Sequence, residues 1–60
     1  MRIKVINDGE QVFEGAAQEF LEINEGDECI EDMVMEAREC GYSTAVFFSG
    51  KWEIFRAGGV

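Results

Sequence analysis

The sequence predicts an α+β domain with the element order ββααββ. A four-stranded, largely antiparallel sheet should carry one short and one longer helix packed on one face. Three observations predict this fold: an Asp-Gly pair between two β-rich runs near the start, a capped apolar periodicity in the middle, and a second aromatic-rich hairpin pattern near the end. Sixty residues suffice for a single domain, 1–60, and 47% hydrophobic residues give it enough apolar material to fold.

The first hairpin is predicted over residues 2–6 and 11–14. Asp8-Gly9 between them supplies the positive φ angles of a two-residue type I′ turn. A regular ladder from that turn pairs Val5 with Val12 and places Phe13 on the opposite face.

Two helices are predicted next. Residues 16–23 have helical spacing of apolar side chains, and the Asn-Glu-Gly run after them ends the helix. Asp27 then caps a second helix over 28–40, and Gly41 ends it. The stripe of this helix that should face the core consists of Ile30, Met33, Val34 and Ala37.

The second hairpin is predicted over residues 42–48 and 52–56, joined by Ser49-Gly50-Lys51, and residues 57–60 are expected to be a loose tail. Two helices cover only one face of such a sheet, so aromatic side chains remain on the other face whichever is covered. Three explanations stay open: pairing of two copies through the open face, a hydrophobic partner site, or shielding by long neighbouring side chains.

Cys29 and Cys40 fall in the same predicted helix, roughly 16 Å apart along its axis, so they cannot form a disulfide within it. We expect both to be buried, reduced thiols, with an intermolecular disulfide as the alternative.

No pattern of catalytic or metal-ligating residues is present. Histidine is absent, the serines and threonine have no evident activating base, and neither a calcium-loop spacing nor a phosphate-binding glycine pattern occurs. We therefore expect no enzyme activity, no metal and no cofactor. The sequence also has no secretion signal and no apolar run of about 20 residues, which favours the cytoplasm and no membrane association.

The charge is concentrated in one part of the chain. The formal net charge is −8, and residues 8–39 contain twelve of the thirteen acidic side chains and one basic one, Arg38. Such a field attracts basic partners and repels nucleic acid, so direct DNA or RNA binding is not expected. The alternative is that the charge only keeps a small domain soluble.

The acidic side chains of the second helix lie opposite its core stripe and surround one methionine. A central apolar residue within a charged ring is typical of a small interface anchor, although single exposed apolar residues are also common. The predicted partner-binding residues are Glu28, Glu31, Asp32, Met35, Glu36 and Glu39.

Two resemblances point to different functions. The opening Met1-Arg2-Ile3-Lys4-Val5, the segments 9–15 and 20–23, and the ending Arg56-Ala57-Gly58-Gly59 resemble the ubiquitin-like sulfur carriers of thiamine and molybdopterin synthesis. That resemblance implies a β-grasp fold and activation of a terminal Gly-Gly carboxylate. Val60 follows Gly59, so the carrier reading requires trimming of the chain.

In length, acidity and lack of catalytic residues, the chain resembles the small inhibitors encoded by phages and mobile elements, among them anti-CRISPR proteins that mimic DNA. The resemblance implies a non-enzymatic inhibitor that occupies the nucleic-acid-binding surface of a basic partner protein, such as a CRISPR effector subunit. A phage-encoded protein of this type would act in the host cytoplasm.

Overall fold

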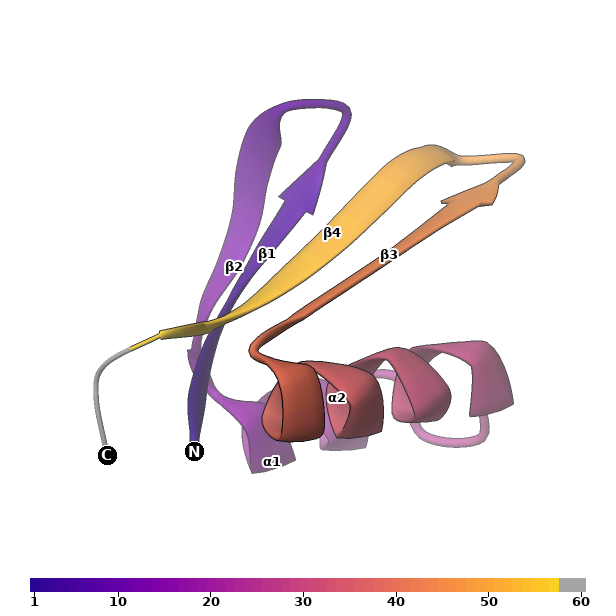
Figure 1. The fold of residues 1–60 in the computed structure, drawn as a ribbon. Helices are drawn as coiled ribbons and strands as arrows, with labels where there is room; N and C mark the ends of the chain where they lie inside the picture. The colour runs from indigo at the N-terminus through magenta and orange to yellow at the C-terminus, as the bar shows by residue number, and fades with distance from the viewer. Residues whose placement is uncertain (58–60) are drawn as a thin grey trace.

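The computed structural model describes residues 1–57. Its elements are β1 (Arg2–Asn7), β2 (Glu10–Ala16), α1 (Ala17–Ile23), α2 (Glu28–Cys40), β3 (Tyr42–Phe47) and β4 (Gly50–Ala57). The four strands form one sheet in the order β2-β1-β4-β3, and all three pairings are antiparallel (Figure 1). The predicted α+β fold with the order ββααββ is confirmed.

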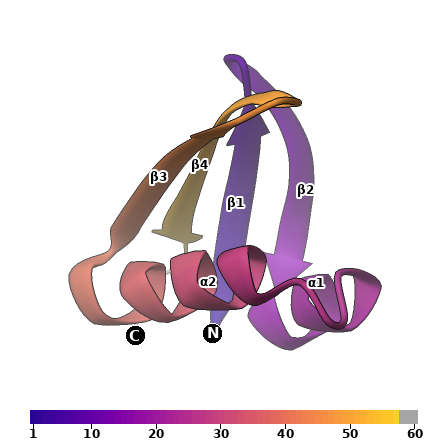
Figure 2. The ribbon, with the colours of Figure 1, turned by 90° about the vertical axis from the view of Figure 1, so that its right-hand side faces the viewer.

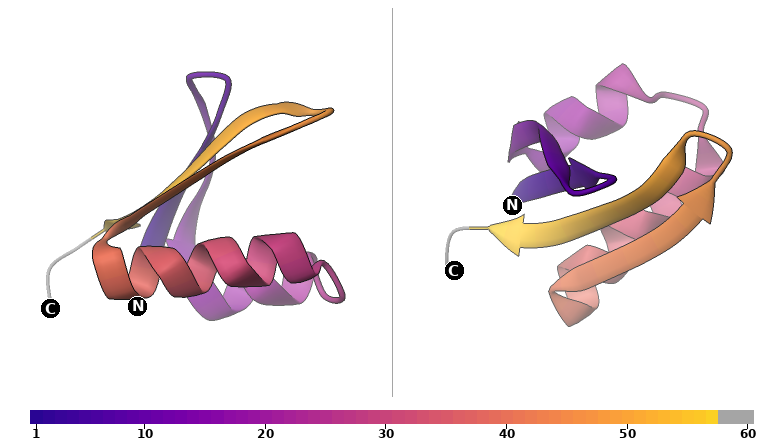
Figure 3. Two further views of the ribbon diagram at one scale, coloured as in Figure 1. Left: turned by 45° about the vertical axis from the view of Figure 1, so that its right-hand side comes forward. Right: turned by 90° about the horizontal axis from the view of Figure 1, so that it is seen from above.

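Both helices lie on the same side of the sheet (Figure 3). They cross one end of it, and the turns of the two hairpins point away from them (Figures 1 and 2). The helices therefore cover the sheet near the starts of β1 and β3, and the parts of the strands next to the turns extend beyond the helix layer.

The core lies between the helices and the two central strands. Ile3 and Val5 of β1 are fully buried, and Ile54 of β4 is almost so. The helices contribute the remaining large apolar side chains of the core, including the complete predicted stripe of α2. The buried hydrophobic residues are Ile3, Val5, Ala17, Phe20, Ile30, Met33, Val34, Ala37 and Ile54.

The ends of α2 are those that the sequence predicts. The Asp27 carboxylate accepts a hydrogen bond from the backbone N–H of Ile30 at 3.2 Å, which satisfies one of the free donors of the first turn. At the other end, Gly41 adopts φ 87° and its N–H donates to the carbonyl oxygen of Ala37. Glycine is favoured at this position because the residue must adopt a left-handed conformation.

The predicted register of the first hairpin is wrong beyond its first two pairs. Asp8 and Gly9 do form the turn, with φ angles of 49° and 85°. The register then shifts between Ile6 and Val5, so Val5 pairs with Phe13 and Val12 is the extra residue of a β-bulge. The shift turns Phe13 inward, where its ring lies 5.0 Å from that of Phe20.

The second turn begins one residue earlier than predicted and has two residues, where the sequence predicted the three residues 49–51. β3 ends at Phe47 and β4 begins at Gly50, so Phe48 and Ser49 form the connection. Gly50 has φ 115°, and the carboxylate of Asp8 occupies the space that a Cβ atom would need. Because Asp8 reaches across from the first hairpin, the position of this turn depends on a contact that is distant in sequence.

Two further expectations need correction. Ala57, assigned above to a loose tail, is the last residue of β4 and pairs with Arg2; residues 58–60 lie outside the described residues. Cys29 and Cys40 are free but exposed rather than buried. They lie on the same flank of α2 as Glu36, which contacts β3, and β3 is one of the two edge strands, so no further strand covers that flank.

Candidate functional site

All six predicted partner-binding residues lie on the exposed side of α2. Met35 is 59% exposed, although it is a large apolar side chain in the middle of the helix. We call this set, Glu28, Glu31, Asp32, Met35, Glu36 and Glu39, the acidic face.

One member of the acidic face also supports the fold. The Glu36 carboxylate accepts a hydrogen bond of 2.7 Å from the hydroxyl of Ser43 on β3. Ser43 is only 2% exposed, and within residues 1–57 no buried side-chain polar atom lacks a hydrogen-bond partner. Glu36 thus satisfies a buried hydroxyl, so its replacement would change more than surface charge.

The fold separates charge between its two layers. The helix layer, residues 17–40, contains nine acidic side chains against Arg38 alone, a formal charge of −8. The remaining described residues, 1–16 and 41–57, contain four acidic and four basic side chains and sum to zero. The whole net charge of the protein therefore lies on the side of the molecule that carries the helices.

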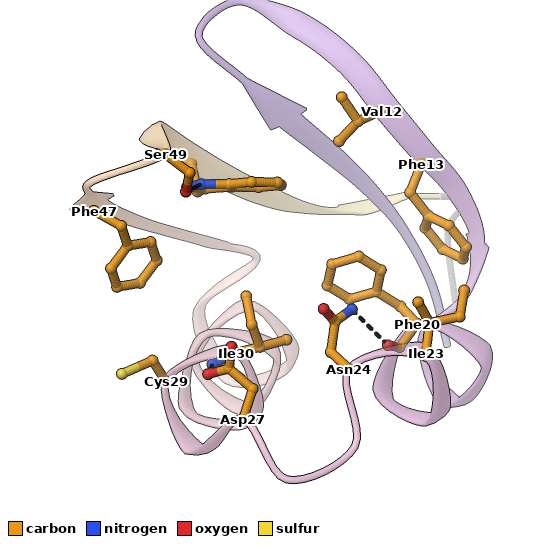
Figure 4. Close-up of a pocket in the computed structure, with 11 residues that line it drawn as sticks. Val12, Phe13, Phe20, Ile23, Asn24, Asp27, Cys29, Ile30, Phe47 and Ser49 are labelled. Carbon is orange, nitrogen blue, oxygen red and sulfur yellow. Dashed lines mark hydrogen bonds between the residues drawn. The ribbon is translucent and has the colours of Figure 1, made fainter.

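A pocket of about 540 Å³ opens beside the helix layer, and the sequence did not predict it (Figure 4). It lies between the inward face of the sheet, the end of α1 and the start of α2. Four aromatic rings from four different elements line it. The lining residues are Val12, Phe13, Phe20, Ile23, Asn24, Asp27, Cys29, Ile30, Phe47, Ser49 and Trp52.

Two polar side chains that line this pocket donate hydrogen bonds within the protein. The indole N–H of Trp52 donates to the Ser49 hydroxyl at 2.8 Å, and the Asn24 side-chain amide donates to the Phe20 carbonyl at 3.0 Å. The surface left for a ligand is therefore mostly aromatic and aliphatic, with the Asp27 carboxylate at its edge.

The sequence does contain a signal for the pocket, namely the aromatic side chains of the strands. The alternation of residues along a strand does not show which of them the helices cover. Phe13, Phe47 and Trp52 all face the helix side of the sheet and are only partly buried. Phe47 and Trp52 lie near the second turn, in the parts of the strands that extend beyond the helices, whereas the ring of Phe13 packs beside Phe20 of α1. Comparing strand length with helix length would have indicated uncovered aromatic side chains on the inward face.

The outward face of the sheet is less apolar than expected. Its aromatic side chains pack on each other: the rings of Tyr42 and Phe55 lie 4.8 Å apart, and the Tyr42 hydroxyl donates to Glu53 at 2.8 Å. Lys4 lies next to Phe55 in the register, as in the shielding explanation. Val46, at 78% exposure, is the most exposed apolar side chain of the strands.

Three further comparisons and two structural criteria point to no metal site, membrane span or known family within residues 1–57. Within residues 1–57, no three cysteine or carboxylate side chains are grouped so that they could hold a metal ion, and no helix is long and apolar enough to cross a membrane. Comparison with protein-family models, with curated proteins and with solved structures gave no match.

Proposed function

We propose that this protein is a non-enzymatic inhibitor that binds through its acidic helix layer to the basic, nucleic-acid-binding surface of a partner protein. The separation of charge carries the proposal: a formal −8 on the helix layer and zero on the remaining described residues. A CRISPR effector subunit is one partner of this kind, as the resemblance to anti-CRISPR proteins suggests. The mechanism is competitive occupancy, in which carboxylates take the place of phosphates.

The geometry of α2 suits such a role. Carboxylates at positions i and i+4, as in Glu28, Asp32 and Glu36, recur about every 6 Å along a helix and project to the same side. Like charges at this spacing cost a helix a few tenths of a kcal/mol per pair, so local stability does not explain the row. A basic groove would remove that repulsion on binding.

Met35 gives the acidic face an apolar centre. Its side chain is exposed among carboxylates, and the flexible thioether adapts to irregular partner surfaces. Interfaces gain most of their affinity from such central contacts, while surrounding charges steer the approach and set specificity.

The test compares two charge reversals of equal size. Asp32→Lys with Glu39→Lys alters the acidic face but leaves Glu36 and its bond to Ser43 intact. Glu10→Lys with Glu14→Lys makes the same change on β2, in the layer whose charges sum to zero. Each pair brings the formal net charge from −8 to −4. Circular dichroism and urea unfolding would establish that both variants fold.

Immobilised proteins would then capture nucleic-acid-binding proteins from a bacterial lysate. The proposal expects wild type and the β2 variant to retain a partner that added duplex DNA and high salt displace, and the α2 variant to lose it. Equal retention by the α2 variant, or retention that duplex DNA does not affect, would contradict the proposal.

A further inference from the structure

The pocket beside the helix layer has apolar walls that the protein itself leaves open. Ile23 and Val12 at its rim are 67% and 48% exposed, yet both line the pocket. Figure 4 shows Phe13 and Phe47 on opposite sides of the opening, with Phe20 and Ile30 between them. Exposed apolar surface that is concave and built from several elements is typical of binding sites.

Its volume of about 540 Å³ is enough for one or two large apolar side chains. Pockets that hold small organic groups measure about 300–1,000 Å³, and this one falls within that range. The indole N–H of Trp52 and the side-chain amide of Asn24 already donate within the protein, and most of the other lining side chains are apolar. An apolar group fits the walls best.

The charge at the opening restricts the occupant further. Asp27 is part of the lining and is exposed, and the exposed Glu25 and Glu28 flank it in sequence. These carboxylates belong to the helix layer with its formal −8. A second copy of this chain carries the same net charge of −8 and would be repelled at long range, whereas an apolar group between cations would be attracted.

We infer that the pocket receives a short segment of the basic partner, in which one or two large apolar side chains are flanked by lysine or arginine. The apolar side chains enter between the aromatic rings of Phe13, Phe47 and Trp52, and the flanking cations face Asp27 and its acidic neighbours. The inference rests on the proposed function, since it takes the partner to be basic, and adds a second contact beside the acidic face.

Trp52 provides the readout, because it is the only tryptophan of the chain and lines the pocket. Three capped hexapeptides serve as probes for full-length protein: Arg-Arg-Leu-Leu-Arg-Arg, Arg-Arg-Ser-Ser-Arg-Arg with the same charge, and Glu-Glu-Leu-Leu-Glu-Glu with the same apolar centre. We expect saturable change in Trp52 fluorescence with the first peptide and at least tenfold weaker binding of the other two.

Two variants test the location. Ile23→Ser with Val12→Ser removes apolar surface from the rim, where high exposure means little cost to the fold. Val46→Ser is the control for removal of an exposed apolar side chain elsewhere, because Val46 is also exposed but lies on the outward face of the sheet. We expect the rim variant to weaken binding of Arg-Arg-Leu-Leu-Arg-Arg about tenfold and the control to leave it unchanged.

Equal binding of the leucine and serine peptides with basic flanks, or equal weakening by the rim variant and Val46→Ser, would overturn the inference. Neither result bears on the acidic face, which the charge reversals on α2 test separately. If those reversals abolish partner capture while the peptides fail to distinguish leucine from serine, the proposed function stands without the pocket. If the peptides behave as expected and the reversals have no effect, the proposed function fails.

Discussion

The hydroxyl of Ser43 on β3 donates a 2.7 Å hydrogen bond to the carboxylate of Glu36 on α2, which links the acidic face to the sheet. Ser43 is buried and Glu36 is exposed, so the bond joins the interior of the protein to its charged surface. Two roles meet at Glu36: it contributes charge to the acidic face, and it satisfies a hydroxyl that water does not reach.

The first prediction separates these roles. Glu36→Ala should lower the free energy of unfolding by about 1–3 kcal/mol, because the Ser43 hydroxyl loses its partner. Adding Ser43→Ala removes the unsatisfied group, so the double variant should be more stable than Glu36→Ala alone. Urea unfolding measures both. Glu39→Ala is the control. If it lowered the free energy of unfolding as much as Glu36→Ala does, the structural role of Glu36 would be refuted.

The second prediction concerns the contact between the two hairpin turns. The Asp8 carboxylate accepts from the backbone N–H of Lys51 at 2.8 Å, and the Asp8 N–H donates to the carbonyl of Lys51 at 2.8 Å. Asp8→Ala should cost about 1–3 kcal/mol, since it removes the acceptor and places alanine at φ 49°. Asp8→Asn retains an oxygen acceptor, and asparagine tolerates that φ angle. Its loss of stability, measured by thermal unfolding, should therefore be much smaller. Equal losses for the two variants would argue against the contact.

The third prediction compares two glycines with positive φ. Gly26 has φ 91° and open space around it, whereas Gly50 has φ 115° and the Asp8 carboxylate where a Cβ would lie. Gly26→Ala should lower the free energy of unfolding by about 1–2 kcal/mol, because alanine is strained at this φ angle. Gly50→Ala should cost more, because the side chain of Asp8 must also move. Chemical unfolding of both variants gives the comparison, and an equal or smaller loss for Gly50→Ala would contradict it.

Local signals predicted the elements well because their causes are local. The bounds of α2 follow from a capping aspartate and from a glycine that supplies the left-handed residue, and the structure contains both interactions. The Asp8-Gly9 turn is local in the same sense.

The errors have causes that lie elsewhere in the chain. The bulge at Val12 places Phe13 against Phe20, and Gly15 leaves room for the Phe13 ring. The second turn differs from its predicted position at the point where the Asp8 side chain contacts Gly50. The aromatic pocket depends on how far the strands extend past the helices, which no single segment specifies. The exposure of the six residues of the acidic face followed from helical periodicity; their role in binding remains the proposal above.

The fourth prediction uses the helix dipole to separate stability from binding. Glu39 lies in the last turn of α2, where a negative charge opposes the dipole and a positive charge favours it. Glu39→Lys should therefore leave the melting temperature unchanged or raise it, while weakening the binding of a basic partner. Thermal unfolding and a binding titration on the same sample measure the two effects. A lower melting temperature together with unchanged affinity would contradict both parts.

The most direct measurement is the affinity of a captured, purified partner for the two variants of equal charge. At low salt, Asp32→Lys with Glu39→Lys on α2 should bind roughly a hundredfold more weakly than wild type, because cations then face a basic surface. Glu10→Lys with Glu14→Lys on β2 should bind within a few fold of wild type. If the two variants lose affinity equally, net charge rather than the acidic face determines binding, and the account is wrong.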